Sequence, residues 1–234
     1  MNLDESRYAR LRWNTPLSED HAALLLDRLD PTGSIVDLGC GWGELLLRAV
    51  ERSGGTGIGV DTDPAGLARG RTGAAARGLA ERVTFVEQPA AEWSGHADQA
   101  LCVGASHAFG GSRAMLEALA EVVPRGRVLV GDGCWPGPPT PAALEIFGTD
   151  VLPLADLVDA CRATGWRLLH LSVADEREWD DFESRHRAGQ EEWLLTNGDD
   201  PRAAEVRDRQ DHRWNEYLTA YRGVLGLAYL VVAR

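Results

Sequence analysis

The feature that most constrains this chain is a glycine-rich segment directly after a short apolar stretch. Residues Ser34 to Leu38 predict a buried strand, and glycines follow at alternate positions, Gly39, Gly41 and Gly43. An apolar stripe with helical spacing then continues to Glu51. Glycine adopts positive φ without strain and places no Cβ between the backbone and a ligand. The segment therefore predicts a strand, a tight turn and a helix, with a ligand lying against the turn.

The alternation of strand and helix continues over residues 34–173, which predicts an α/β fold with helices on both faces of a mostly parallel sheet. Pro64 fits the first turn of a helix, and Ser18 is placed to cap another. Further strands are expected at 56–60, 83–86, 99–103, 127–130, 166–173 and 225–233, and helices at 19–29, 113–122 and 154–164.

We expect a single domain over residues 1–234. Within it, residues 1–30 are expected to form an N-terminal helical lid, and residues 31–173 the core that carries the glycine turn. Residues 174–223 are a polar insertion rich in Arg and Glu, with aromatic residues at helical spacing. The lid and this insertion should form a helical cap over one end of the sheet, and residues 224–234 should supply the last strand.

Charge and composition exclude several classes of function. The net charge is -12 and the arginines form no basic stripe, which argues against a nucleic-acid partner. Every basic residue is Arg, so a mechanism that needs a lysine is excluded. No apolar run is long enough to span a membrane. We expect a cytoplasmic protein without disulfides or a metal site, because no CxxC pair occurs among Cys40, Cys102, Cys134 and Cys161.

Carboxylates near the glycine turn indicate the ligand's charge. Asp37 at the end of the first strand, and Glu44 at the last Gly/Ala position of a GxGxxG pattern, would repel a pyrophosphate. They suit a ligand that carries an ammonium or sulfonium group. Asp61 ends the next strand, where a carboxylate can accept hydrogen bonds from both ribose hydroxyls. Together these residues predict a positively charged nucleoside ligand.

The motifs VDLGCGWGE and GIGVDTDP resemble those of class I S-adenosylmethionine-dependent methyltransferases. The resemblance implies a Rossmann-like fold with a seven-stranded sheet and S-adenosylmethionine as cofactor. It also implies that the glycines flank the methionine part and that Asp61 binds the ribose. The cofactor-binding residues expected on this basis are Asp37, Gly39, Cys40, Gly41, Gly43, Asp61, Thr62, Gln88, Ala90 and Gly104.

The chain departs from the family pattern after the third strand. Pro89 stands where the family commonly has an acidic residue near the adenine, so Gln88 or the Ala90 amide would have to replace that contact. Farther along, LCVGASHAFGG, VLVGDGCWPGPPTP and the N-terminal TPLSED resemble a subgroup that acts on small molecules. The resemblance extends over nearly the whole chain.

His107 follows the fourth strand, where the family places residues beside the transferred methyl group. An imidazole that titrates near neutral pH could remove a proton from an oxygen or nitrogen nucleophile. The alternative is a histidine bonded to loop backbone. Asp132 could orient His107, bind substrate or cap a loop.

Large aromatic residues gather outside the cofactor core. They could form an apolar pocket for the acceptor, or they could fasten the helical cap to the sheet. The residues considered for substrate binding, besides His107 and Asp132, are Trp13, Trp135, Trp179, Tyr217 and Tyr221.

The function expected is methyl transfer from S-adenosylmethionine to a small molecule by in-line displacement. An oxygen or nitrogen acceptor is favoured because of His107. Two alternatives stay open: an NAD-dependent oxidoreductase, which Asp37 and Glu44 oppose, and a non-catalytic protein that binds S-adenosylmethionine.

Overall fold

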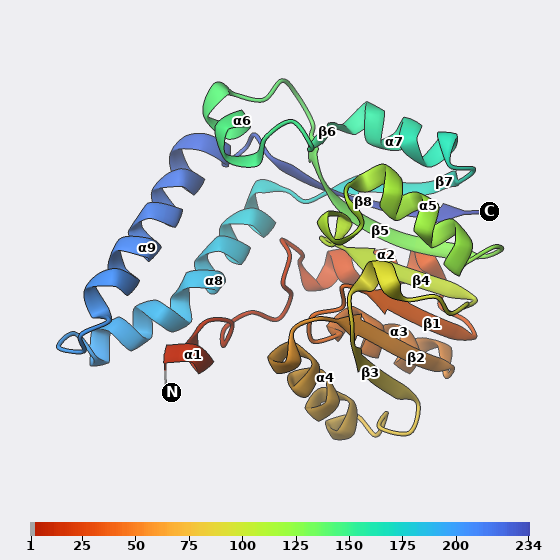
Figure 1. Cartoon of the computed structure of the whole chain (residues 1–234), viewed down its shortest axis with the longest axis horizontal. Helices are drawn as coiled ribbons and strands as arrows, with labels where there is room; N and C mark the ends of the chain where they lie inside the picture. Colours follow the sequence, from red (N-terminus) through yellow and green to blue (C-terminus); the bar gives the residue numbers. More distant parts are fainter. Residues whose placement is uncertain (1–2) are drawn as a thin grey trace.

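A sheet of eight strands runs through the middle of the computed structural model, which describes residues 3–234 (Figure 1). Seven strands follow the order β3-β2-β1-β4-β5-β8-β7, and the short β6 pairs with the end of β5. The strands β1 to β5 are parallel, and β8 runs antiparallel to both neighbours. Their bounds are β1 (Ser34–Leu38), β2 (Thr56–Asp61), β3 (Val83–Glu87), β4 (Gln99–Val103), β5 (Arg127–Trp135), β6 (Leu152–Pro153), β7 (Arg167–Val173) and β8 (Gly226–Ala233).

The helices agree with the expected positions, with two additions. Ser18 accepts a hydrogen bond from the His21 amide at the start of its helix, as predicted. The four-residue α1 and the short α6 were not predicted. The helices are α1 (Leu3–Ser6), α2 (Glu19–Leu29), α3 (Glu44–Ser53), α4 (Pro64–Ala76), α5 (Ser112–Val122), α6 (Pro141–Phe147), α7 (Leu154–Ala163), α8 (Glu176–Thr196) and α9 (Ala203–Glu216), with 3-10 turns η1 (Ala90–Glu92) and η2 (Ser106–Phe109) and a π-helical turn η3 (Tyr217–Tyr221).

Alternate residues of each central strand enter opposite cores. On β4, Leu101 joins the core beneath α2, α3 and α4, whereas Ala100 and Cys102 join the core beneath α5 and α7. Because successive side chains of a strand point to opposite faces, a strand covered on both faces is apolar throughout. The expected mostly parallel sheet with helices on both faces is confirmed.

The insertion before the last strand is helical, as expected. The long helices α8 and α9 pack side by side and project beyond the sheet (Figure 1). α8 begins with a capping box at Asp175 and Glu178. Between the two helices the buried Glu183 pairs with Arg213, at 2.8 Å, and accepts a hydrogen bond from the Tyr221 hydroxyl.

The N-terminal segment differs from the expected helical lid. α2 packs on the sheet, against β5 and β8, through Leu25, Leu26 and Leu29. Its apolar face is used there, so it cannot cover a ligand site. The N-terminal residues that line a cavity at the carboxyl ends of the strands are instead Trp13, Asn14 and Thr15, in the non-helical segment of residues 11–17. Residues 1 and 2 of the expected lid lie outside the described residues.

The glycine turn is tied to the strand beside it. The amides of Gly39 and Cys40 both donate to the carbonyl of Val60, at 2.9 and 3.0 Å. Gly39 has φ of 78°, and a Cβ placed on it would lie 2.3 Å from the Cβ of Ala105. This position therefore requires glycine for its backbone conformation and for the close approach of the chain that follows β4.

We expect Gly39→Ala to lower the free energy of unfolding by about 2–4 kcal/mol, because backbone strain adds to the steric overlap. Gly54→Ala is a matched control, since Gly54 has φ of 69° but a Cβ added there would meet no neighbouring atom within 4 Å. It should cost only about 1 kcal/mol. Urea unfolding of both variants measures the difference. Equal losses would show that contact with Ala105 does not constrain the turn.

Candidate active site

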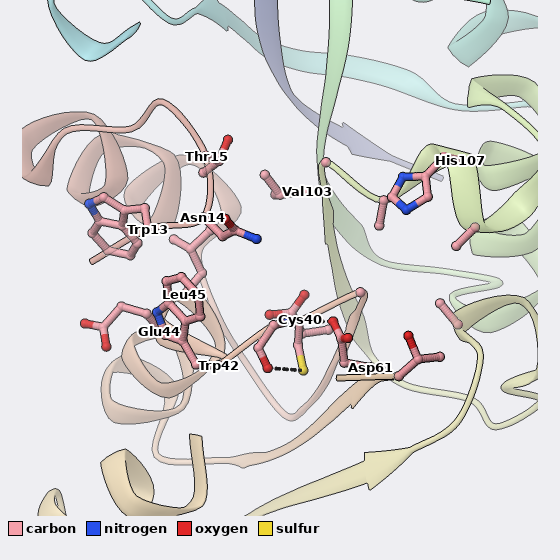
Figure 2. Close-up of a pocket in the computed structure, with 18 of the residues that line it drawn as sticks. Trp13, Asn14, Thr15, Cys40, Trp42, Glu44, Leu45, Asp61, Val103 and His107 are labelled. Carbon is pink, nitrogen blue, oxygen red and sulfur yellow. Dashed lines mark hydrogen bonds between the residues drawn. The ribbon is translucent and has the colours of Figure 1, made fainter. Parts of the chain in front are cut away.

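A cavity of about 400 Å³ lies where the carboxyl ends of β1, β2 and β4 meet (Figure 2). Its size falls in the range of small-molecule sites. Figure 2 shows Trp13, Asn14 and Thr15 on one side and His107 on the other. Most of the expected cofactor-binding residues line this cavity, namely Asp37, Gly39, Cys40, Gly41, Asp61, Thr62, Ala90 and Gly104.

Two expected cofactor residues do not line the cavity. A Cβ on Gly43 would lie 2.7 Å from the Phe85 ring, so this glycine allows close packing of helix on strand. The backbone N–H of Gln88 donates to the backbone carbonyl of Asp61, at 3.0 Å. Its neighbours Pro89 and Ala90 line the cavity. The cavity wall at this point is therefore apolar.

The Asp61 carboxylate is hydrogen-bonded to the glycine turn. One carboxylate oxygen accepts from the Gly41 amide at 2.7 Å, and the other accepts from the Asp63 amide at 2.9 Å. Asp63 itself caps α4 by accepting from the Ala65 amide, as the sequence indicated. A carboxylate oxygen accepts more than one hydrogen bond, so Asp61 retains lone pairs for a ligand in the cavity.

Asp37 has a different environment. Its side chain is only 5% exposed, and no hydrogen bond to it occurs within residues 3–234. Burial, together with the nearby charge of Asp61, raises the pKa of Asp37 to about 8. Without a ligand the carboxyl is therefore mostly protonated at neutral pH. A cationic group in the cavity would favour the ionised form.

Glu44 does not have the electrostatic role expected from the sequence. It accepts hydrogen bonds from Arg48 at 2.8 Å and from Arg77 at 2.6 Å, and these arginines lower its pKa. Because its charge is offset, Glu44 does not repel a phosphate. Neither of the two carboxylates expected to oppose a pyrophosphate therefore does so by charge in the ligand-free protein, since Glu44 is paired with arginines and Asp37 is mostly protonated.

His107 lies on η2, between two cavities. It lines the cavity just described and a second one, of about 1010 Å³, bounded by η2, the end of β5 and α7. Its ring is exposed and takes part in no hydrogen bond within the described residues. The alternative in which loop backbone holds this histidine is therefore not what the structure shows.

Of the three roles considered for Asp132, a direct hydrogen bond that orients His107 is not formed. Asp132 is buried, and its two oxygens accept from the hydroxyls of Ser106 at 2.7 Å and Ser112 at 2.6 Å. It lines the second cavity, but its carboxylate is engaged in fixing η2 against the start of α5. Asp132 thus acts on the position of His107 only through the adjacent Ser106.

The aromatic residues separate into two groups. Trp13 lines the first cavity, with the Arg48 guanidinium 4.6 Å from its ring centre. The others line neither cavity and pack in a cluster that joins the cap to the sheet; the Tyr217 hydroxyl, for example, donates to Asp180. Of the two roles considered for these residues, the structure shows the packing role for Trp135, Trp179, Tyr217 and Tyr221.

Several lining residues were missed by the sequence analysis. Asn14 and Thr15 precede a helix in a segment without periodicity, so nothing in the pattern marks them. Trp42 was also missed, although a large aromatic residue between two glycines of the turn could have indicated a position at the cavity. It is 7% exposed and borders the cavity.

The chain matches a family model described as "Methyltransferase domain" over residues 35–126. It is 32% identical to the uncharacterized protein YjhP of Escherichia coli, over 95% of this chain and 94% of the relative. The solved structure of YjhP superposes with a TM-score of 0.86. An S-adenosylmethionine-dependent methyltransferase from Geobacter sulfurreducens, solved with S-adenosylhomocysteine, is 28% identical over 99% of this chain and 98% of its own, with a TM-score of 0.89.

This chain belongs to the class I S-adenosylmethionine-dependent methyltransferases. A second solved methyltransferase with S-adenosylhomocysteine, from Thiobacillus denitrificans, is 27% identical over 100% of this chain and 99% of its own, with a TM-score of 0.87. The expected family, fold and cofactor are thereby confirmed, and a nicotinamide-dependent oxidoreductase is disfavoured.

The cavity of this methyltransferase fits S-adenosylmethionine chemically. Asp37 supplies a buried carboxyl for a positive charge, and Asp61 supplies free acceptors for hydroxyl groups. No cluster of three or more acidic, His or Cys side chains suited to a metal ion occurs among the side chains that the structure describes. No helix in that range is long and apolar enough to cross a bilayer.

The raised pKa of Asp37 predicts a pH-dependent stability. Between about pH 4 and pH 8 the folded, ligand-free protein keeps a proton on Asp37 that the unfolded chain releases. Stability should therefore fall as pH rises through this range, by at most about 1.4 kcal/mol per pH unit. Asp37→Asn should remove this part of the slope and make the ligand-free protein more stable at pH 8. Identical slopes for both proteins in denaturant titrations would contradict the assignment.

Proposed function

We propose that this methyltransferase transfers a methyl group to an oxygen or nitrogen nucleophile of a small molecule. The observation that carries the proposal is the position of His107, which borders both cavities. A cofactor in the first cavity and an acceptor in the second would meet at this side chain. Each cavity would then hold one of the two reactants of a displacement reaction.

The first cavity would hold the cofactor by its polar groups. Asp61 would accept hydrogen bonds from the ribose hydroxyls while it keeps the Gly41 amide in place. Asp37 would lie near the positive charge. The small apolar residues Pro89, Ala90 and Ala105 also line this cavity and would pack against the adenine. This apolar packing would replace the contact with an acidic residue that is common in the family. When bound, S-adenosylmethionine supplies an activated methyl group.

The second cavity would hold the acceptor. It opens between η2, the α6–β6 loop and α7, with Phe147 and Val151 among its apolar residues. A chamber of about 1010 Å³ is of the size that holds small molecules. A neutral His107 ring nitrogen could accept the proton that an oxygen or nitrogen nucleophile loses on methylation. The remaining requirement is alignment of the acceptor with the methyl group, which the walls of the cavity would provide.

The direct test is an acceptor screen. Purified protein would be incubated with S-adenosylmethionine and panels of alcohols, phenols, carboxylic acids, amines, thiols and carbon acids, and formation of S-adenosylhomocysteine would be followed. Turnover with an oxygen or nitrogen acceptor supports the proposal. Turnover only with a thiol or a carbon acid would contradict it. Cofactor binding without turnover on any panel would favour a non-catalytic binding protein.

His107→Ala should lower kcat by about 10²-fold or more while changing cofactor affinity less than about twofold, because loss of a general base acts on the chemical step. His96→Ala is the control: His96 lies ahead of β4, where its Nδ1 contacts the Glu121 carbonyl, and lines neither cavity. Equal losses of turnover and affinity in His107→Ala would instead indicate a structural role.

Asp61→Ala should weaken cofactor binding by at least about tenfold, because it removes acceptors for the ribose and the anchor of the Gly41 amide. Asp63→Ala is a matched control two residues away. It removes the cap of α4 and should cost about 1 kcal/mol of stability with little change in affinity. Calorimetric titration with S-adenosylhomocysteine compares the two. Unchanged affinity in Asp61→Ala would exclude the ribose contact.

A further inference from the structure

The non-helical segment of residues 11–17, here called the strap, forms one wall of the cofactor cavity. Trp13, Asn14 and Thr15 all line that cavity, and Figure 2 shows them opposite His107. Within the described part of the chain, residues 12–17 make no hydrogen bond from backbone to backbone. The strap is therefore held by its own buried side chains, such as Trp13 and Leu17, and by side chains of other elements that bond to its carbonyls.

On the cofactor side, the glycine turn and α4 hold the start of the strap. The Trp42 indole donates to the carbonyl of Arg12 at 2.8 Å. Arg69 donates to the carbonyl of Leu11 at 2.5 Å, and its guanidinium lies 4.0 Å from the centre of the Trp42 ring. The strap is thus attached directly to the loop that bears the cofactor motif.

On the sheet side, Leu17 packs in the core and a buried tyrosine hydroxyl bonds to the strap. Tyr229 lies in the middle of β8 and is completely inaccessible to solvent. Its hydroxyl donates to the carbonyl of Pro16 at 2.8 Å and lies 3.1 Å from the Oγ1 of Thr15. A phenylalanine would fill the same space without the cost of burying a hydroxyl. We therefore infer that the role of the Tyr229 hydroxyl is to hold the strap in place.

The hydrogen-bond roles determine what Thr15 offers to a ligand. Tyr229 has one hydroxyl proton, and the Pro16 carbonyl can only accept it. At the contact between Thr15 and Tyr229 the threonine is then the donor. Its own oxygen lone pairs stay free, and Thr15 lines the cofactor cavity. Thr15 is thus set to accept a hydrogen bond from an N–H group of a bound molecule.

We propose that the strap is part of the cofactor site, with Thr15 accepting a hydrogen bond from the ammonium group at the amino-acid end of the cofactor and Tyr229 acting as the positioning residue for Thr15. The inference rests on the proposed use of the first cavity by S-adenosylmethionine. It adds a contact that comes from outside the glycine and Asp61 motifs.

The test compares two probes, S-adenosylhomocysteine and 5′-methylthioadenosine, which lacks the amino-acid end. Tyr229→Phe and Thr15→Val should each raise the Kd for S-adenosylhomocysteine about five- to tenfold, the effect of one hydrogen bond. The Kd for 5′-methylthioadenosine should change less than about twofold. Thr15→Ser keeps the hydroxyl and should bind both probes as the unmodified protein does. The double variant should bind no worse than Thr15→Val, because Tyr229 acts through Thr15.

Gln99→Met is the matched structural control. The Gln99 amide is a buried donor to the carbonyls of Leu29 and Asp30, at the opposite end of β4 from the cavity. This variant should lose stability without any change in either Kd.

Three results would overturn the inference: unchanged binding of S-adenosylhomocysteine in both single variants, equal losses for the two probes, or additive losses in the double variant. Failure of the unmodified protein to bind S-adenosylhomocysteine would be a different result. It would refute the proposed cofactor cavity itself, and the role of the strap with it.

Discussion

The attachment of the glycine turn to β2 is the interaction on which the site depends. The Val60 carbonyl accepts from two successive amides of the turn, and the Asp61 carboxylate accepts from a third. These bonds join the ends of neighbouring parallel strands, where ligands bind in open α/β sheets. They also bring Gly39 against Ala105, so the segment after β4 closes the far wall of the same cavity. One set of contacts thus fixes two walls of the first cavity, where we propose that the cofactor binds.

The buried Asp37 carboxyl favours the binding of a cationic ligand and does not stabilise the ligand-free protein. Asp37 is buried without a hydrogen-bond partner in the described structure, and its raised pKa is the consequence. Such a carboxyl contributes little to the folded state in the absence of a ligand. It gains a favourable interaction only when a positive charge enters the cavity. The buried Tyr229 hydroxyl and the Asp132 carboxylate differ from it, because both are satisfied within the protein and position other residues.

The sequence predicted those features that depend on interactions between residues close together in the chain. The strands, the turn at Gly39 and the helix caps at Ser18 and Asp63 follow from spacing and residue type. The part of the molecule around the helical cap was predicted less well, because it depends on contacts between distant segments. Tyr217 and Tyr221 resembled pocket residues, yet their hydroxyls bind acidic residues of α8. The strap has no periodicity, and the two-residue β6 is too short to leave a pattern.

The most direct test is calorimetric titration of the unmodified protein with S-adenosylmethionine, S-adenosylhomocysteine and NAD in buffers of different ionisation enthalpy near pH 7. We predict that both adenosyl ligands bind and that NAD does not. Binding should also release protons, because a cationic ligand group lowers the pKa of Asp37 from about 8. Binding of NAD, or absence of binding by both adenosyl ligands, would contradict the central claim that this cavity is built for a positively charged adenosyl cofactor.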